Sequence, residues 1–335
     1  MPTTPTTIDA LVERIAQGRE RILTELRKVI VGQDDTIDLV LTALFTGGHC
    51  LITGVPGLAK TLLIKTLADV LDLKFKRIQF TPDLMPADIT GTEILDEKDG
   101  HREMRFVHGP IFTQILLADE INRTPPKTQA ALLEAMQERH VTASGRTWPL
   151  EPPLFVLATQ NPIELEGTYP LPEAQLDRFM FNLVMTYLPE NDEVAVVMQT
   201  TSAAQSTPGR VLGGDDIMAF HQLFRQVVVT DEVARYAVRL AQASRPGRTP
   251  ADEYVDRYVK WGAGLRGGQA LVLGAKARAI MRGRAHVSVA DIKALAAPTL
   301  RHRIVTNFYA ESDRVTSDAI VAHVLERVPA PASGM

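Results

Sequence analysis

Short apolar runs alternate with amphipathic stretches along the first 190 residues of the chain. Apolar residues recur at helical spacing over 8–29 and 37–45, which predicts two amphipathic helices. Buried strands are expected at the short apolar runs 50–52, 115–118, 154–158 and 179–185. The segment 73–80 alternates less regularly and is rich in Lys and Arg, so we expect it to be the edge strand of the sheet. Strands that alternate with helices predict an α/β core with a parallel sheet.

The pattern changes from residue 190 onward. Residues 200–214 are rich in small and polar side chains, which indicates a loop or linker. Residues 215–325 keep helical periodicity and show no clear strand pattern, and Ser288 with Asp291 resembles the capping box that begins a helix. We therefore expect two domains, an α/β core and a smaller all-helical domain, over residues 1–189 and 190–335.

Two excursions interrupt the α/β half of the chain. Residues 81–110 form an irregular insertion in which a polar Asp99-Gly100 turn predicts a hairpin. A second hairpin is expected within 139–150, around Ser144-Gly145. Exposed side chains on such excursions, Trp148 in particular, predict contact with a substrate or partner. Packing of Trp148 against a neighbouring domain remains the alternative interpretation.

Composition restricts the class of protein. The 335 residues are 45% hydrophobic and 23% charged, which is typical of globular chains with room for two domains. A net charge of −4 makes non-specific binding of nucleic acid unexpected. The chain starts with polar residues and has no apolar run of about 18 residues, so we expect neither a signal peptide nor a membrane segment. With one cysteine, Cys50, and no metal-like spacing of histidines, the chain is expected to be cytoplasmic.

The most informative motif is a strand, a glycine-bearing loop and a helix around residue 60. The candidate nucleotide-binding residues of this motif are Gly54, Val55, Pro56, Gly57, Leu58, Ala59, Lys60, Thr61 and Leu62. Unpaired amides at the start of a helix, together with the helix dipole, attract phosphate groups. Lys60 adds a positive charge, and the hydroxyl of Thr61 can ligate Mg²⁺. Ala59 stands where the pattern G-x-x-x-x-G-K-[ST] has its second glycine, and we expect a negative φ there.

Polar side chains follow two of the predicted buried strands. Asp119 and Glu120 end the run 115–118, and Asn161 lies shortly after 154–158. Ligands bind at the carboxyl ends of parallel strands, so these groups can meet at one crevice. There Asp119 would hold Mg²⁺ and Glu120 would polarise the attacking water. Asn161 could orient water or touch the terminal phosphate.

The predicted start of a later helix carries another candidate residue, Arg266. The helix dipole disfavours a cation at this end, which makes an anionic partner one interpretation and a solvated arginine the other.

Taken together, the segments GVPGLAKT, ILLADEINR, LATQNP and LPEAQLDRF resemble the MoxR family of AAA+ ATPases. The resemblance begins near Val31 and runs through the segment RHRI, so it covers most of the chain. It implies a five-stranded parallel sheet with strand order 5-1-4-3-2 and a helical lid. In this family the excursion at 81–110 would be the helix-2 insert, and the hairpin at 139–150 would be the pre-sensor-1 insert.

The resemblance also implies a role for each candidate residue. Val31, Gly32 and Gln33 would border the adenine, and the phosphate-loop and acidic residues would keep the roles given above. Asn161 would be sensor 1. Arg178 would be the arginine finger that reaches the phosphate of a neighbouring subunit. Arg266 would be sensor 2, carried by the lid and placed beside Lys60 in the same subunit.

The implied reaction is Mg²⁺-dependent hydrolysis of ATP to ADP and phosphate in a homo-oligomeric ring, expected to be a hexamer. The implied work is chaperone-like remodelling or maturation of protein complexes, such as insertion of a metal cofactor, with a partner that carries a von Willebrand factor A domain. A nucleic-acid motor and an ion-chelatase subunit remain alternatives. Intact Glu120 and Arg178 argue against a scaffold that does not hydrolyse ATP.

Overall fold

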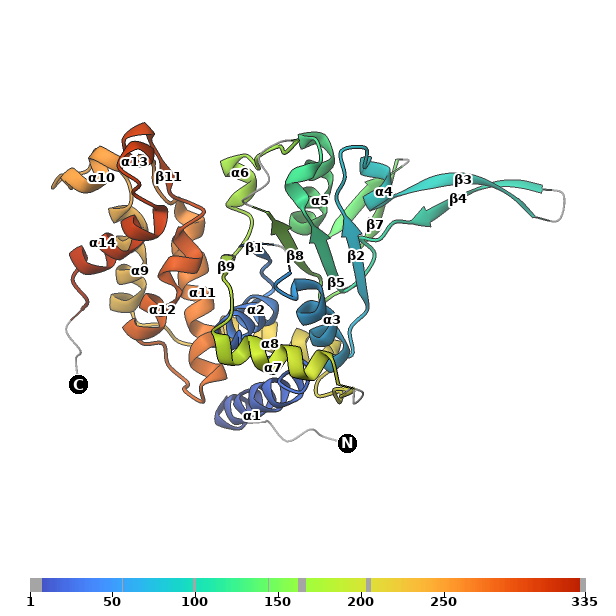
Figure 1. Ribbon diagram of the computed structural model, residues 1–335, viewed down its shortest axis with the longest axis horizontal. Helices are drawn as coiled ribbons and strands as arrows, with labels where there is room; N and C mark the ends of the chain where they lie inside the picture. Colours follow the sequence, from blue (N-terminus) through green and yellow to red (C-terminus); the bar gives the residue numbers. More distant parts are fainter. Residues whose placement is uncertain are drawn as a thin grey trace.

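The computed structural model describes residues 8–55, 57–98, 101–143, 145–161, 167–202 and 206–331. Its centre is a five-stranded parallel sheet of order β2-β5-β8-β1-β9 (Figure 1). The strands are β1 (Cys50–Gly54), β2 (Phe75–Gln79), β5 (Ile115–Asp119), β8 (Phe155–Gln160) and β9 (Phe181–Met185). This order, counted along the five core strands, is the expected 5-1-4-3-2, and β2 is the edge strand as predicted.

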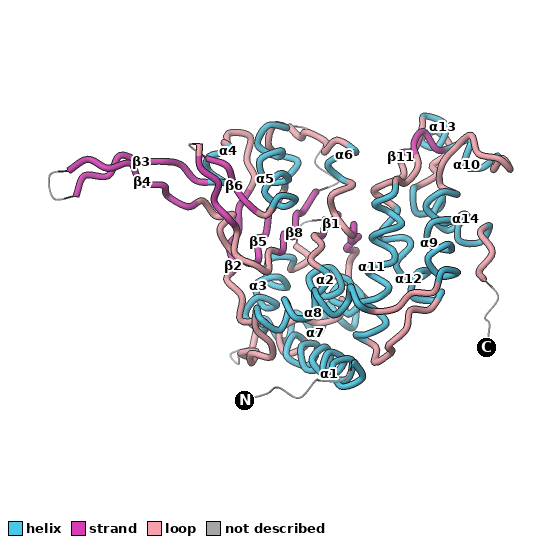
Figure 2. The backbone as a smooth tube through the Cα atoms, turned by 180° about the vertical axis from the view of Figure 1, so that it is seen from behind, coloured by secondary structure: helices cyan, strands magenta, loops and turns pink. Residues whose placement is uncertain are grey.

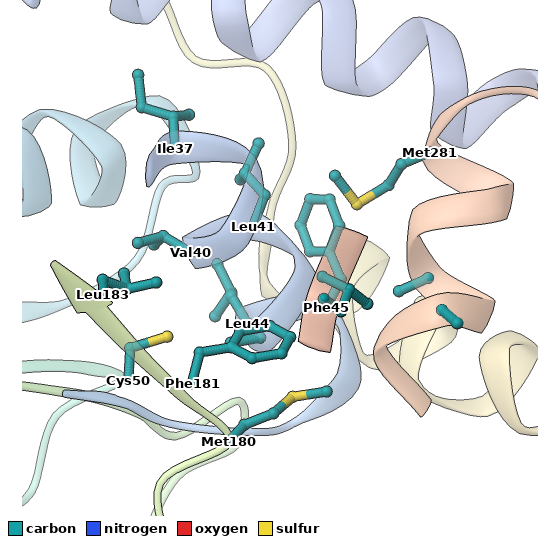
Figure 3. Close-up of a cluster of buried hydrophobic side chains, with 14 of the residues drawn as sticks. Ile37, Val40, Leu41, Leu44, Phe45, Cys50, Met180, Phe181, Leu183 and Met281 are labelled. Carbon is teal, nitrogen blue, oxygen red and sulfur yellow. The ribbon is translucent and has the colours of Figure 1, made fainter. Parts of the chain in front are cut away.

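The apolar strands are buried because helices cover both faces of the sheet. Alternate residues of a strand point to opposite faces, so Ile52 and Leu117 pack with one cluster and Leu51 and Leu116 with the other. The first face is covered by α1 (Ile8–Leu26), α2 (Asp34–Thr46) and α3 (Lys60–Val70). The second is covered by α5 (Pro126–Glu138), which follows the short 3-10 helix η1 (Ile121–Arg123). Figure 3 shows apolar side chains of α2 packed against β1 and β9.

The C-terminal part of the chain is helical. Its helices are α7 (Glu190–Thr200), α8 (Gly214–Gln226), α9 (Asp231–Ala243), α10 (Glu253–Tyr258), α11 (Leu265–Met281), α12 (Val289–Leu300), α13 (Phe308–Ser312) and α14 (Ser317–Arg327). A short antiparallel ladder of β10 (Val259–Trp261) and β11 (Val305–Thr306) is an addition that the sequence did not indicate. Helices α9 to α14 lie together on one side of the core, whereas α7 and α8 lie near α1 (Figures 1 and 2). The domain boundary at 190 stays a prediction.

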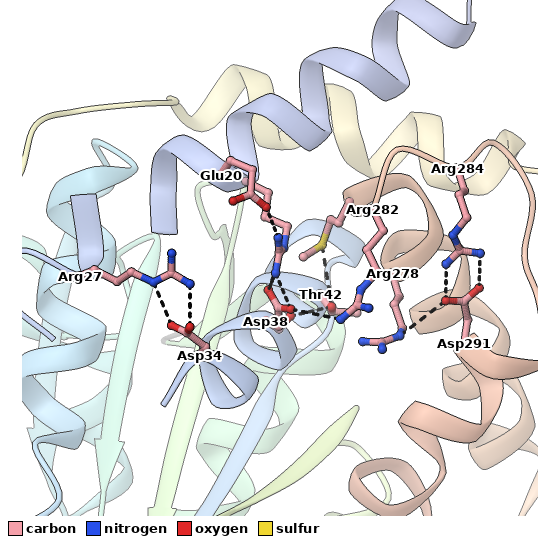
Figure 4. Close-up of polar contacts among 11 residues, drawn as sticks. Glu20, Arg27, Asp34, Asp38, Thr42, Arg278, Arg282, Arg284 and Asp291 are labelled. Carbon is pink, nitrogen blue, oxygen red and sulfur yellow. Dashed lines mark hydrogen bonds and ion pairs between the residues drawn. The ribbon is translucent and has the colours of Figure 1, made fainter. Parts of the chain in front are cut away.

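The helical part is attached along the edge of the sheet that β9 forms. Helix α11 packs on α1, α2 and α8, and α12 packs on β9. A Cβ atom added at Gly274 would lie 3.0 Å from the ring of Phe181 and 2.9 Å from Leu295, so this glycine permits the close approach of α11. Ion pairs join the same elements, since Asp38 of α2 lies 2.6 Å from Arg19 of α1 and 3.8 Å from Arg282, just after α11 (Figure 4).

Both predicted hairpins are present. After α4 (Pro86–Thr90), β3 (Gly91–Lys98) and β4 (His101–His108) extend away from the body of the protein (Figures 1 and 2). The second hairpin pairs β6 (His140–Ala143) with β7 (Arg146–Pro149). The turn residues Asp99, Gly100 and Ser144 lie outside the described residues. Within the described part of the chain, no helix has the length and apolarity needed to cross a bilayer.

The two hairpins meet at an aromatic contact. The ring of Trp148 stacks on Phe106 with centroids 4.6 Å apart and an interplanar angle of 13°. Trp148 is therefore half-buried, and the expectation of an exposed side chain was wrong. The reason is that the base of the first hairpin lies against the second hairpin, which the sequence pattern of either hairpin alone does not reveal.

Candidate active site

A cavity of about 450 Å³ lies at the carboxyl ends of the central strands. Most of the predicted phosphate, metal and water-activating residues line it together, along with Thr159: Gly54, Gly57, Leu58, Ala59, Lys60, Thr61, Leu62, Asp119, Glu120, Thr159 and Asn161. Val55 is half-buried in the same loop, and Pro56 lies outside the described residues. The parallel sheet thus brings together groups that are about a hundred residues apart in sequence.

The loop reaches the helix through a left-handed alanine. Ala59 has φ 54° and ψ 26°, so the expectation of a negative φ was wrong. Ala59 is the N-cap residue, and its left-handed turn redirects the chain from the loop into α3, which begins at Lys60. A residue other than glycine in the left-handed region of φ/ψ space destabilises the fold by roughly 1–2 kcal/mol, so other interactions of the fold must offset this cost at Ala59.

Lys60 and the first turn of α3 give the cavity its positive character. The Nζ atom of Lys60 donates a hydrogen bond to the carbonyl oxygen of Gly54. Burial lowers the pKa of Lys60, while the charges of Asp119 and Glu120 raise it. The first amides of α3 have no acceptor within the helix and can bind an anion. A cation and free amides at one helix start suit a phosphate group.

Asp119 is fixed by two neighbours on adjacent strands. Its Oδ1 accepts a hydrogen bond of 2.6 Å from the hydroxyl of Thr159, and its Oδ2 pairs with Arg77 Nη2 at 2.7 Å. The same Thr159 oxygen accepts a 2.8 Å hydrogen bond from the backbone amide of Glu120. Thr159 therefore holds the two acidic residues together, a role that sequence reasoning missed.

Glu120 also has partners that the sequence did not reveal. Its backbone is left-handed, with φ 57°, and its Oε2 accepts hydrogen bonds from Gln79 at 2.9 Å and Arg123 at 3.0 Å. We expected the polar residues of 73–80 only to protect a sheet edge. Arg77 in fact reaches Asp119, the last residue of β5, and Gln79, the register partner of Asp119, reaches Glu120. Their spacing of two residues was the available signal.

The residues present fit a magnesium-bound nucleotide. The Thr61 hydroxyl and the Asp119 carboxylate lie in the same cavity, and both are oxygen donors of the kind that Mg²⁺ prefers. Mg²⁺ is commonly held by one or two protein groups together with substrate phosphates and water. With Thr61 and Asp119 as its protein ligands, Mg²⁺ would keep its other coordination positions for water and for phosphates beside Lys60.

The segment Val31–Gln33 lies beside this site. Gln33 precedes α2 with φ 62°, and its Nε2 donates a long hydrogen bond of 3.4 Å to the carbonyl of Leu58. Its Oε1 is buried and has no hydrogen-bond partner among the described residues. A Cβ atom added at Gly32 would lie 3.0 Å from Asp192 Oδ2, so the segment is enclosed between the phosphate loop and the start of α7. A ligand that donates a hydrogen bond here would satisfy Gln33.

Arg178 and Arg266 lie at the other end of the sheet. They line a separate cavity of about 210 Å³ with His49 and Asp177. His49 directly precedes β1, and its carbonyl accepts a 2.8 Å hydrogen bond from the amide of Met180. At ~3.3 Å per residue, the five steps from His49 to Gly54 separate this cavity from the phosphate loop by about 16 Å.

The expectation that Arg266 lies beside Lys60 is therefore not met. Arg266 Nη1 lies 3.8 Å from Asp177 Oδ2. The reason is the attachment of α11 and α12 along β9, which brings the start of α11 to the amino end of the sheet. Arg178 is half-buried, and its buried Nε has no hydrogen-bond partner among the described residues. Two arginines are thus presented together, away from the phosphate loop of their own chain.

Comparison with known proteins agrees with this geometry. Residues 49–181 match the ATPase family associated with various cellular activities (AAA), and residues 251–324 match the AAA lid domain. The chain is 40% identical over 312 residues to Chaperone MoxR1 of Mycobacterium tuberculosis, a match that covers 93% of this chain and 82% of that protein. It is 32% identical to the protein MoxR of Methylorubrum extorquens, with 96% of this chain and 98% of the relative covered.

A solved structure gives the same result. The crystal structure of a candidate ATPase from Cytophaga hutchinsonii superposes with a TM-score of 0.87 at 40% identity, and the match covers 96% of this chain and 98% of that chain. The fold, the lid and the relatives therefore identify one family. The chain belongs to the MoxR family of AAA+ ATPases.

Proposed function

We propose that this protein hydrolyses ATP to ADP and phosphate in a Mg²⁺-dependent reaction, within a homo-oligomeric ring that remodels protein complexes. The first part rests on the cavity at the carboxyl ends of the strands, where Lys60, Thr61, Asp119, Glu120 and Asn161 are within reach of one ligand. Bound Mg²⁺ would neutralise charge that develops on the phosphates. The residues of the chain position the reactants around it.

Each residue has a defined task in this proposal. Lys60 and the amides of the loop bind the β- and γ-phosphates, while Thr61 and Asp119 hold the metal ion. Glu120 accepts a proton from, or orients, the attacking water once its carboxylate is released from Gln79 and Arg123. Asn161 contacts the terminal phosphate or the water. The segment Val31–Gln33 borders the adenine.

The observation that carries the proposal of a ring is the separation of Arg178 from Lys60. The two side chains lie at opposite ends of strand β1, so the arginine cannot serve the phosphate loop of its own subunit. Arg178, with Arg266 beside it, instead completes the site of a neighbouring subunit. Repetition of this head-to-tail contact closes a ring, which we expect to be a hexamer. By analogy with other arginine fingers, the contribution to turnover is ~10³-fold or more.

Mixing two inactive variants tests this arrangement. Arg178→Ala should bind ATP normally and hydrolyse it poorly, whereas Lys60→Ala should not bind ATP. Mixed rings contain sites in which an intact phosphate loop meets an intact arginine from the next subunit, so phosphate release should recover. If rings that contain both variants stay inactive at every ratio, Arg178 does not act on a neighbour.

The target of the ATPase is proposed from the relatives and the hairpins. A relative carries the name Chaperone MoxR1, and the hairpin β3–β4 exposes apolar residues such as Leu95 and Met104 on an arm that extends from the core. We propose that the arm contacts a protein substrate or a partner with a von Willebrand factor A domain, in the cytoplasm, and that maturation of a metal-containing complex is one such task. Affinity capture with Glu120→Gln, which should trap the ATP-bound ring, compared with Lys60→Ala, identifies that protein. Equal recovery of every protein by the two variants would contradict the proposal.

A further inference from the structure

Among the described residues of the core, the backbone before Arg178 is held only by local turn bonds, whereas Phe179, the residue after it, is buried in the core. Arg178 follows α6 (Glu173–Leu176), a helix of four residues none of which is buried. The amides of Arg178 and Phe179 bond to the carbonyls of Gln175 and Leu176 in α6, and the amide of Met180 bonds to the carbonyl of His49. Other contacts must fix the direction in which the side chain of Arg178 points.

The helical lid supplies that support through Arg303, which follows α12. Its side chain is only 3% exposed, and its Nε donates a 2.8 Å hydrogen bond to Asp177 Oδ1. Its Nη2 donates to the carbonyls of Asp177 at 3.1 Å and Phe179 at 2.7 Å. One guanidinium therefore binds the residue before Arg178 and the residue after it.

Two further lid residues support the same segment. The buried His302 places its Nε2 3.0 Å from the carbonyl oxygen of Phe179 and 2.9 Å from Arg303 Nη1. Arg266 lies 3.8 Å from Asp177 Oδ2, so the Asp177 carboxylate lies between two arginines of the lid. A buried cation is stable only when it is paired and hydrogen-bonded, which makes Arg303 and Asp177 dependent on each other.

We infer that Arg303 is a positioning residue that fixes the backbone on both sides of Arg178 from the lid, so that the placement of the lid sets how Arg178 is presented to the neighbouring subunit. The inference rests on the proposed action of Arg178 on a neighbour. It adds a physical link between the lid of one subunit and ATP turnover in the next.

The test uses the full-length protein and the substitution Arg303→Lys. Lysine keeps the charge beside Asp177 but has one terminal nitrogen in place of a planar fork, so it cannot hold both flanking carbonyls and the carboxylate. We expect turnover to fall about 10- to 100-fold through misplacement of Arg178. ATP affinity, measured with a fluorescent ATP analogue, should stay within about twofold, because the phosphate loop is untouched.

The matched control is Arg301→Lys, two residues earlier. Arg301 contacts Asp318 and the carbonyl of Asn182, beyond the Arg178 segment, so its substitution should leave turnover unchanged. Asp177→Asn is the second variant, which replaces Arg303→Lys if that protein does not assemble. It should show the same loss of turnover with retained ATP binding.

Mixing with Lys60→Ala separates positioning from general damage. If Arg303→Lys harms only the presentation of Arg178, a site is intact when its phosphate loop comes from an Arg303→Lys subunit and its Arg178 comes from a Lys60→Ala subunit. In an equal random mixture this holds for about a quarter of the sites, and turnover should recover to about a quarter of the parental value. Parental turnover of Arg303→Lys, or absence of recovery while Arg178→Ala recovers, overturns the inference alone. Absence of recovery for Arg178→Ala as well overturns the proposed action on a neighbour.

Discussion

Replacing Ala59 with glycine should stabilise the protein, although it removes a methyl group. The residue has φ 54° and ψ 26°, a conformation that an L-residue adopts at a cost and that glycine adopts freely. The methyl group of Ala59 is exposed, so its removal leaves no cavity. The substitution therefore isolates backbone strain at the phosphate loop from packing.

The size of the effect follows from two opposing contributions. Relief of the left-handed conformation is worth about 1–2 kcal/mol. The greater freedom of glycine in the unfolded chain costs about 0.4–1 kcal/mol. The difference of these contributions gives an expected gain in the free energy of unfolding of about 0–1.6 kcal/mol, centred near 0.8 kcal/mol.

Urea unfolding of the nucleotide-free protein, followed by far-ultraviolet circular dichroism, measures the gain as a higher midpoint with an unchanged slope. The matched control is Ala130→Gly, an exposed alanine inside α5, where glycine should lower stability by about 1 kcal/mol. Opposite shifts support the argument. A midpoint for Ala59→Gly that falls along with that of Ala130→Gly would refute it.

Three other predictions concern single side chains. Lys60→Ala should abolish ATP binding, while Glu120→Gln should keep binding and stop hydrolysis; equilibrium binding and phosphate release distinguish the two, and parental turnover by the glutamine variant would exclude Glu120 as the water-activating group. Burial lowers the pKa of His49 to about 4, so the unfolded chain binds its proton more tightly, and about 3 kcal/mol of stability present above pH 6.5 is lost as the pH falls toward 4. The difference between the urea midpoints at pH 7.5 and 5.5 should become smaller in His49→Gln, while His221 and His302, whose pKa values burial also lowers, keep their share of it. An unchanged difference would contradict this. Gln79→Ala should raise basal turnover severalfold at unchanged ATP affinity, because it removes one of two hydrogen bonds that restrain the Glu120 carboxylate, each worth about 1.5–3 kcal/mol, while the bond from Arg123 remains. Turnover equal to that of the parent would show that the Gln79 contact does not restrain Glu120.

The elements that sequence predicted well are those with a strong local signal. Uninterrupted apolar runs predicted β1, β5 and β8, because strands covered by helices on both faces have no polar side. The carboxyl ends of these strands then predicted that Asp119 and Glu120 meet Lys60 in one cavity, as the structure confirms. This prediction succeeds because the carboxyl ends of parallel strands lie at the same edge of the sheet, whatever their separation in sequence.

The features that sequence did not predict depend on distant parts of the chain. The left-handed backbone of Ala59 is imposed by the path from strand to helix, against the residue's own preference. The contacts of Arg77 with Asp119 require the register of β2 on β5. The location of Arg266 depends on the packing of α11 and α12 against β9, and no motif around Arg266 encodes that docking.

The stack of Trp148 on Phe106 allows intrinsic tryptophan fluorescence to report on the contact between the two hairpins. The chain has two tryptophans, and Trp261 is exposed on β10, so Trp261→Phe leaves a single indole whose emission reports the junction of the two hairpins. An indole stacked on a phenyl ring emits at shorter wavelength than one in water. A molecule that pulls on the arm β3–β4 would separate the rings and shift the emission to the red. Stopped-flow fluorescence can then time the arm against phosphate release without an attached dye.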